Sequence, residues 1–355
     1  MQSVLMYGRI LTRALANSVF SYSTCATSPD AKYAWAKGDL GLQTVTCGFP
    51  KERNRFSIGL GRGQFGDDAC FAAKYKSFDV LGVADGVGGW RTYGVDPSLF
   101  STALMRNCER VVHSGRFKPN SPASIIASSY YELLENKRHI IGSSTACVLV
   151  LNCVERILYS ANLGDSGFLV VRRGQVVHRS QEQQHYFNTP FQLCLPPPGV
   201  SQFVLSDSPE SADTSSFPVQ EGDLILMATD GLFDNLPENM IVNELAQLRD
   251  TSFDSIQQTV NSLALQARRL AFDEAHLSPF SLRARDNGID TIGEIPCFLL
   301  LVCVLTLMPL CLEFQLEIYS LVNLSHIIAS VALHTALSVQ KLFLLPNRQM
   351  KYCVF

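Results

Sequence analysis

The chain of 355 residues is long enough for one large domain or two small ones, and its net charge of −3 argues against a nucleic-acid-binding surface. The 11 cysteines include no Cys-x-x-Cys pair and the 7 histidines have no metal-type spacing, so neither a zinc site nor a disulfide framework is expected. Any metal chemistry must then use carboxylates. We expect a monomer that binds no nucleic acid.

Residues 1–30 have the composition of a mitochondrial presequence. They are rich in Ser and Thr, carry Arg9 and Arg13, and contain no acid before Asp30. On a helix, the two arginines fall opposite an apolar face. The pattern predicts import into the mitochondrial matrix, and an ordinary disordered N-terminus is the alternative. Residues 31–57 follow as a linker and first-strand region.

The middle of the chain alternates hairpin-forming strands with pairs of helices, which predicts a layered α+β fold rather than a parallel doubly wound sheet. The Pro-rich residues 195–199 and the Ser/Asp-rich residues 206–216 predict an exposed loop, either an ordinary one or a flap that selects substrates. The predicted strands cover residues 78–84, 146–152, 157–162, 167–172, 175–178 and 224–229, and the predicted helices cover residues 97–115, 122–135, 238–249 and 254–274.

Two of the predicted strands end in the same way. The first runs into Asp85-Gly86 and the last into Asp230-Gly231. Hard divalent cations such as Mg²⁺ and Mn²⁺ take oxygen ligands, and a glycine lets the backbone carbonyl approach as a further ligand. Two strand-end aspartates therefore suggest a shared cation. The alternative is a pair of ordinary Asp-Gly turns.

Three further motifs accompany these two in a distinctive order. Residues 66–69 read Gly-Asp-Asp-Ala, residues 142–146 read Gly-Ser-Ser-Thr-Ala, and residues 162–166 read Asn-Leu-Gly-Asp-Ser. Together the five motifs resemble the metal-dependent type 2C protein Ser/Thr phosphatases over roughly residues 58–288. Residues 94–97 and 182–193 make the chain most similar to the mitochondrial branch named after the seventh yeast type 2C phosphatase.

The resemblance implies a four-layer α-β-β-α sandwich of two antiparallel sheets flanked by helices, with metal ions in the cleft between the sheets. It implies hydrolysis of phosphoserine and phosphothreonine in mitochondrial phosphoproteins by a metal-activated water, with two Mg²⁺ or Mn²⁺ ions and no catalytic side-chain nucleophile. The implied metal ligands are the Asp85 carboxylate as the bridge, the Gly86 carbonyl and the Asp230 carboxylate.

Other residues have weaker expected roles. Arg62 is a candidate for binding the phosphate, although its register does not clearly match the family, and a plain surface arginine is the alternative. The remaining acids of the motifs are expected to hold metal-bound waters or a loosely bound further ion; they are Asp67, Asp68, Asp165 and Asp234.

The resemblance stops after Gly288. The family's last strand usually follows a Gly-x-x-Asp-(Asn or Asp) motif, for which Asp286-Asn287 is a weak substitute, so we expect a sandwich that lacks this strand. Residues 289–355 form an atypical hydrophobic tail, uncharged over residues 295–312 and 318–340.

Three interpretations of the tail stay open: a membrane hairpin within residues 295–340, a tail folded on the core, and an alternative C-terminus from a different exon or intron. The change of sequence pattern after Gly288 favours the alternative C-terminus. The alternative function is a catalytically weakened isoform that acts as a phosphoprotein-binding or membrane-associated scaffold.

Overall fold

The computed structural model describes residues 40–49, 65–135, 140–197, 204–289 and 300–309. Among these, residues 40–308 belong to one compact unit. Two five-stranded sheets form its centre, in the orders β12-β6-β5-β3-β2 and β1-β14-β13-β7-β8. The first contains β2 (Ala69–Tyr75), β3 (Phe78–Ala84), β5 (Ala146–Asn152), β6 (Ile157–Leu163) and β12 (Asp213–Pro218). The second contains β1 (Leu40–Phe49), β7 (Gly167–Arg172), β8 (Gln175–Arg179), β13 (Leu224–Ala228) and β14 (Leu300–Pro309).

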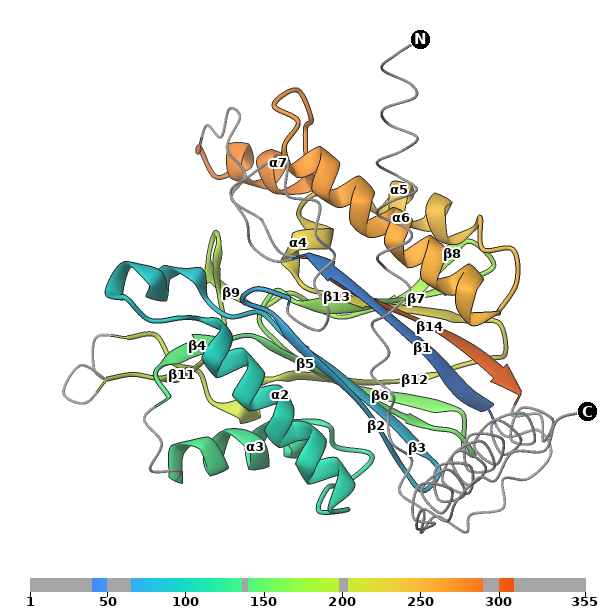
Figure 1. The fold of residues 1–355 in the computed structure, drawn as a ribbon, viewed down its shortest axis with the longest axis horizontal. Coiled ribbons are helices and arrows are strands. Elements are labelled where there is room, and N and C mark those ends of the chain that lie inside the picture. The colour runs from blue at the N-terminus through green and yellow to red at the C-terminus, as the bar shows by residue number, and fades with distance from the viewer. Residues whose placement is uncertain (1–39, 50–64, 136–139, 198–203, 290–299, 310–355) are drawn as a thin grey trace, which may run out of the picture. The chain divides into compact units, whose positions relative to one another are not determined.

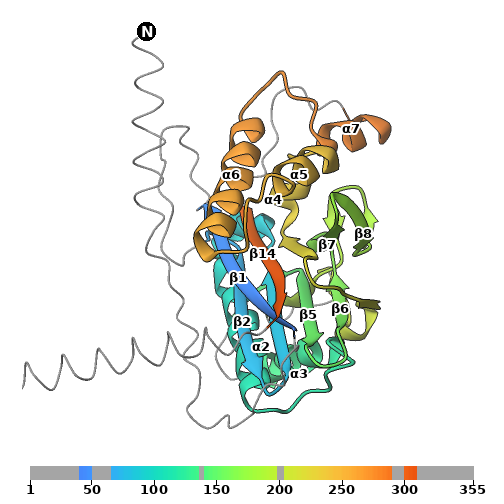
Figure 2. The same ribbon diagram turned by 90° about the vertical axis from the view of Figure 1, so that its right-hand side faces the viewer.

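Helices lie along the outer faces of the two sheets (Figure 1). The principal ones are α2 (Ser98–His113) and α3 (Ala123–Glu135) on one side, and α5 (Glu238–Leu245) and α6 (Phe253–Ala271) on the other. Figure 2 gives the same order of layers from a second direction. The smaller elements are β4 (Gly142–Ser144), β9 (Gln184–Tyr186), β10 (Thr189–Pro190), β11 (Leu193–Leu195), α4 (Asp230–Phe233), α7 (Pro279–Asp286) and the 3₁₀ helices η1 (Gly88–Tyr93) and η3 (Pro209–Ser211).

Three buried apolar clusters hold these layers together. Strand β5 illustrates how: Val148 and Val150 pack toward α2 and α3, whereas Leu149 and Leu151 pack into the cluster between the sheets. The two-residue period of a strand places alternate side chains on opposite faces. A third cluster joins the second sheet to α5 and α6. These clusters confirm the predicted α+β sandwich of two antiparallel sheets flanked by helices.

Most predicted elements agree with the structure. Strands β3, β5 and β7 have the predicted bounds, while α5 ends at Leu245, four residues before the predicted end at residue 249. The prediction of one exposed loop over residues 206–216 is wrong, because β12 begins at Asp213 and pairs with β6. Its side chains alternate between half-buried and exposed, so its polar composition is that of an edge strand.

The expected absence of a last strand is also wrong. Strand β14 pairs antiparallel with β13, with Val304 opposite Leu226, and lies between β13 and β1. Its sequence, Leu-Leu-Val-Cys-Val-Leu-Thr-Leu-Met-Pro, is a continuous apolar run. Such a run suits a strand with neighbours on both sides, but periodicity alone does not distinguish it from a membrane segment.

Several predictions concern residues outside the described ones. These are the presequence (1–30), Arg62, and the tail segments 290–299 and 310–355. Within the described part of the chain, no helix is both long and apolar enough to cross a membrane.

Replacing Val304 by proline tests whether β14 pairs inside the sheet. Because β14 has a partner strand on each side, the loss of one N–H removes a ladder hydrogen bond, and we expect Val304→Pro to lower the free energy of unfolding by about 1–3 kcal/mol. Urea unfolding of the full chain measures this, with Val304→Ile as the control that keeps the N–H. Equal stability of the two variants would show that β14 is not in the sheet.

Candidate active site

The two strand-end aspartates come from different sheets and meet at one place. Asp85 follows β3 directly, and Asp230 is the first residue of α4, separated from the end of β13 by Thr229 alone. Asp85 lies within hydrogen-bonding reach of both Asp230 and Asp68, which precedes β2. We call Asp68, Asp85 and Asp230 the inner acids.

Burial and mutual repulsion act together on the inner acids. Burial raises the pKa of Asp85 well above its usual range, although part of its surface still meets solvent, and the charges of Asp68 and Asp230 raise it further. Burial also raises the pKa of Asp68 well above its usual range; hydrogen bonding to Asp85 opposes this, and the charge of Asp230 adds to it. The ionised forms of both side chains are therefore disfavoured.

One oxygen of Asp68 has no hydrogen-bond donor among the described residues. Asp68 Oδ2 accepts a hydrogen bond from Thr229 Oγ1 at 2.9 Å, whereas Oδ1 is buried without a donor in the described part of the chain. The side chain within its reach is the Asp85 carboxyl, which has no proton to donate when ionised. A proton or a cation bound between Asp68 Oδ1 and the Asp85 carboxyl would give both groups a partner.

Close backbone packing fixes the Asp85-Gly86 turn. Val87 N donates to Ser143 O at 2.9 Å and Thr145 N donates to Asp85 O at 3.0 Å, so this bridge to β4 does not use the Gly86 carbonyl. A Cβ atom on Gly86 would lie 2.6 Å from both Asp67 O and Pro97 O. Only glycine fits at this position without a shift of the backbone.

A second group of acids lies beside the first. Asp165 sits between β6 and β7, Asp234 follows α4, and Glu182 is an exposed residue whose charge acts on both. We call these three the outer acids. Burial and then the charge of Asp230 raise the pKa of Asp234 to about 7, against the opposing effect of Arg283. Burial and the charges of Asp230 and Asp234 also raise the pKa of Asp165 well above its usual range.

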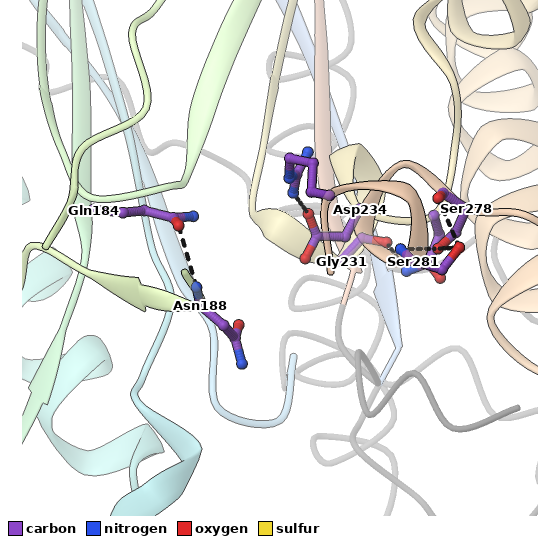
Figure 3. Close-up of polar contacts among 8 residues, drawn as sticks. Gln184, Asn188, Gly231, Asp234, Ser278 and Ser281 are labelled. Carbon is purple, nitrogen blue, oxygen red and sulfur yellow. Dashed lines mark hydrogen bonds and ion pairs between the residues drawn. The ribbon is translucent and has the colours of Figure 1, made fainter. Parts of the chain in front are cut away.

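Two arginines that sequence reasoning missed flank the acids. Arg91, in η1, pairs with the Asp67 carboxylate, and Arg283, in α7, pairs with Asp234. Figure 3 shows Asp234 near Ser278, which caps α7 by accepting a hydrogen bond from Ser281 N at 3.0 Å. The sequence signal that could have identified Arg91 is its position directly after the glycine-rich run that contains Asp85. No sequence signal identified Arg283.

A buried tryptophan holds Arg91 in place. Trp90 Nε1 donates to Ser143 Oγ at 2.7 Å, and Ser143 Oγ donates in turn to Gln192 Oε1 at 2.6 Å. The Arg91 side chain keeps 44% of its surface exposed, whereas that of Asp67 keeps 2%. The guanidinium is thus anchored through a buried partner and open to solvent.

The residues present fit a divalent cation. Two carboxylates, a glycine carbonyl and an orphaned carboxylate oxygen supply the oxygen donors that Mg²⁺ and Mn²⁺ prefer. Among the described residues, no three His, Cys, Asp or Glu side chains are arranged to hold one metal ion among them. A bound ion would therefore rely on one or two carboxylates and on water, as Mg²⁺ commonly does.

Asp286, the weak substitute for the family's last acidic motif, is exposed at the end of α7.

Comparison with known proteins identifies the family. The sequence profile of the family described as Protein phosphatase 2C matches residues 59–271. The chain belongs to the protein phosphatase 2C family. This makes it a protein serine/threonine phosphatase of a metal-dependent family, in agreement with the five motifs.

Individual relatives support the same assignment. The chain is 55% identical over 296 residues to the Protein phosphatase PTC7 homolog of Homo sapiens, which covers 83% of this chain and 95% of that protein. It is 44% identical over 274 residues to the Protein phosphatase PTC7 homolog fig of Drosophila grimshawi, covering 77% and 87% of the two chains. The X-ray structure of the photosystem II phosphatase PBCP is similar with a TM-score of 0.63 and 27% identity, over 76% of this chain and 100% of that one.

The close packing around Gly86 leads to a prediction for a matched pair of variants. Gly86→Ala should lower the melting temperature and phosphatase activity, because its methyl group would lie 2.6 Å from two backbone oxygens. Gly89→Ala is the control, since a Cβ there meets no atom within 4 Å. Thermal melting and a phosphatase assay measure both effects. Indistinguishable behaviour of the two variants would contradict the packing described.

The raised pKa of Asp234 predicts a pH dependence of stability without divalent cations. The native protein holds the Asp234 proton up to about pH 7, whereas the unfolded chain releases it near 3.8. In EDTA the native state therefore binds more protons across this window, and the free energy of unfolding should fall as the pH rises through it. Asp234→Asn should show a smaller fall between pH 5 and 7. The same fall in both proteins would contradict the shift.

Proposed function

We propose that the protein hydrolyses phosphoserine and phosphothreonine in phosphoprotein substrates, with two Mg²⁺ or Mn²⁺ ions held at the inner acids and a metal-activated water as the nucleophile. The observation that carries this proposal is the buried Asp68 Oδ1 within reach of Asp85, because no hydrogen-bond donor among the described residues reaches this oxygen and a cation would neutralise the pair of carboxyls. The best-placed ligands are the carboxylates of Asp85 and Asp230 and the Gly86 carbonyl.

When bound, such cations activate water and neutralise the charge of the phosphate. Hydroxyl side chains of the protein hold Asp85 and Asp68 in position. Thr145 Oγ1 accepts the Asp85 N–H at 3.0 Å and bonds Ser166 Oγ at 2.8 Å, which fixes the backbone of the bridging ligand. Thr229 Oγ1 orients Asp68 from the opposite sheet.

Arg91 is suited to binding the phosphate. A guanidinium can donate two hydrogen bonds to phosphate oxygens, and Arg91 is half exposed where it pairs with Asp67, the neighbour of Asp68 in the chain. Its pairing with buried Asp67 fixes one side of the group and leaves the rest accessible. We therefore assign to Arg91 the phosphate contact for which Arg62 was the sequence candidate.

Assays of the purified full chain test the proposal. With Mn²⁺ and a phosphothreonine peptide, the wild-type protein should release phosphate, and EDTA should abolish the release. Asp85→Asn and Asp230→Asn should each reduce kcat by roughly 100-fold or more, because each removes a charged ligand. Metal-dependent turnover that persists in both variants, or none in the wild-type protein, would refute the proposed function.

We also propose that the phosphatase acts in the mitochondrial matrix. The acid-free, arginine-containing residues 1–29 support this location. Fusion of residues 1–30 to a fluorescent protein should direct it to mitochondria, and replacement of Arg9 and Arg13 by glutamate should prevent this. Cytosolic fluorescence of the unaltered fusion would count against the proposal.

A further inference from the structure

Ser143 holds the 3₁₀ helix η1 at two points. Its backbone oxygen accepts the Val87 N–H at 2.9 Å at the start of η1, and its hydroxyl accepts the Trp90 Nε1–H at 2.7 Å. A 3₁₀ helix of six residues needs such contacts, because its internal hydrogen bonds have poor geometry and Val87, its N-cap residue, has no polar side chain to cap it. The position of η1, and with it that of Arg91, therefore depends on Ser143.

Gln192 sets the direction of the Ser143 hydroxyl. An indole N–H can only donate, so Ser143 Oγ accepts from Trp90 and still has one hydrogen to donate. It donates this hydrogen to Gln192 Oε1 at 2.6 Å. Ser143 is fully buried and Gln192 keeps 8% of its surface exposed. A side chain without an acceptor at position 192 would thus deprive the hydroxyl of its partner in a place shielded from water.

The backbone of Gln192 is itself fixed. Gln192 N donates to Asp207 Oδ2 at 2.8 Å, and Asp207 N donates to Gln192 O at 2.8 Å. The His185 ring approaches the same Asp207 oxygen, with Nε2 at 3.0 Å. Gln192 also directly precedes β11, in which Cys194 pairs with Ser143 of β4. The amide therefore reaches Ser143 from a rigid support.

We propose that Gln192 is a positioning residue for phosphate binding: through the Ser143 hydroxyl and the Trp90 indole, it holds η1 so that Arg91 meets the phosphate of the substrate. This inference rests on the proposed function, in which Arg91 makes the phosphate contact. A guanidinium binds phosphate best when two of its N–H groups point at the oxygens, so a small rotation of η1 weakens the contact. Loss of the Gln192 acceptor should therefore weaken substrate binding more than it slows the chemical step.

Kinetics of the full chain with Mn²⁺ and a phosphothreonine peptide test the proposal. Gln192→Met keeps the length of the side chain and removes the acceptor. We expect it to raise KM roughly 3–10-fold, the effect of one lost hydrogen bond, with kcat within about twofold of the wild-type value. Gln192→Glu retains an oxygen acceptor and should recover most of the wild-type KM. Gln175→Met changes an exposed glutamine of β8 and should match the wild-type protein.

A double-mutant cycle separates positioning from general damage to the fold. In an Arg91→Ala background, Gln192→Met should change KM by less than about twofold, because the group that it positions is absent. In a Trp90→Phe background it should also add little, because the chain of hydrogen bonds is already broken. An equal rise in KM with and without Arg91 would overturn the proposal, as would a wild-type KM in Gln192→Met.

A measurement without turnover keeps this inference distinct from the proposed function. Inorganic phosphate should raise the melting temperature of the wild-type protein in Mg²⁺, and Gln192→Met should need a roughly 3–10-fold higher phosphate concentration for the same rise. A protein that shows these shifts but hydrolyses no phosphoester would refute the proposed function and leave the role of Gln192 intact. Equal stabilisation of both proteins by phosphate, or none of the wild-type protein, would overturn the role of Gln192.

Discussion

Repulsion among buried carboxylates sets the conditions for the site. Burial and neighbouring negative charges raise the pKa of four aspartates, Asp68, Asp85, Asp165 and Asp234. An unpaired buried charge costs several kcal/mol, so these groups cannot all be ionised at neutral pH unless cations accompany them. Among the described residues, Arg283 pairs with Asp234 and Arg91 pairs with Asp67, the neighbour of Asp68 in the chain, and the proposed divalent ions supply further positive charge. Local stability and activity are then two consequences of the same charge balance.

Apolar layers make it possible to hold these acids together. The cluster between the sheets includes Leu81 and Val83 of β3 and Ile225 and Met227 of β13, the strands that lead to Asp85 and Asp230. A strand end that emerges from a close-packed layer has little freedom, so its aspartate stays near acids that repel it. Packing energy from the core thereby offsets the repulsion in the site.

Much of this organisation could be predicted from the sequence. The strands that end at Asp85 and Asp230 are apolar runs of buried-strand length, and β3, β5 and β7 have the predicted bounds. The order of five motifs indicated both the family and the acids that meet. Local patterns suffice here because strand periodicity and the Asp-Gly turns are encoded within a few residues.

The rest depends on contacts between distant residues. The pairing of β14 with β13 joins segments about 80 residues apart in the chain, and its uniform apolar sequence resembles a membrane segment. β12 has a polar sequence because it lies at an edge. Arg283 contacts Asp234, 49 residues earlier, only when α7 docks there. Such partners cannot be read from local composition.

The most direct test of the account is a titration of the metal-free full chain with Mn²⁺, followed by the electron paramagnetic resonance signal of the free ion. The account predicts saturable binding by the wild-type protein that is greatly weakened in Asp85→Asn, with the fold of both proteins intact by circular dichroism. Equal binding by the two proteins, or no saturable binding by the folded wild-type protein, would contradict the claim that the inner acids form a cation site.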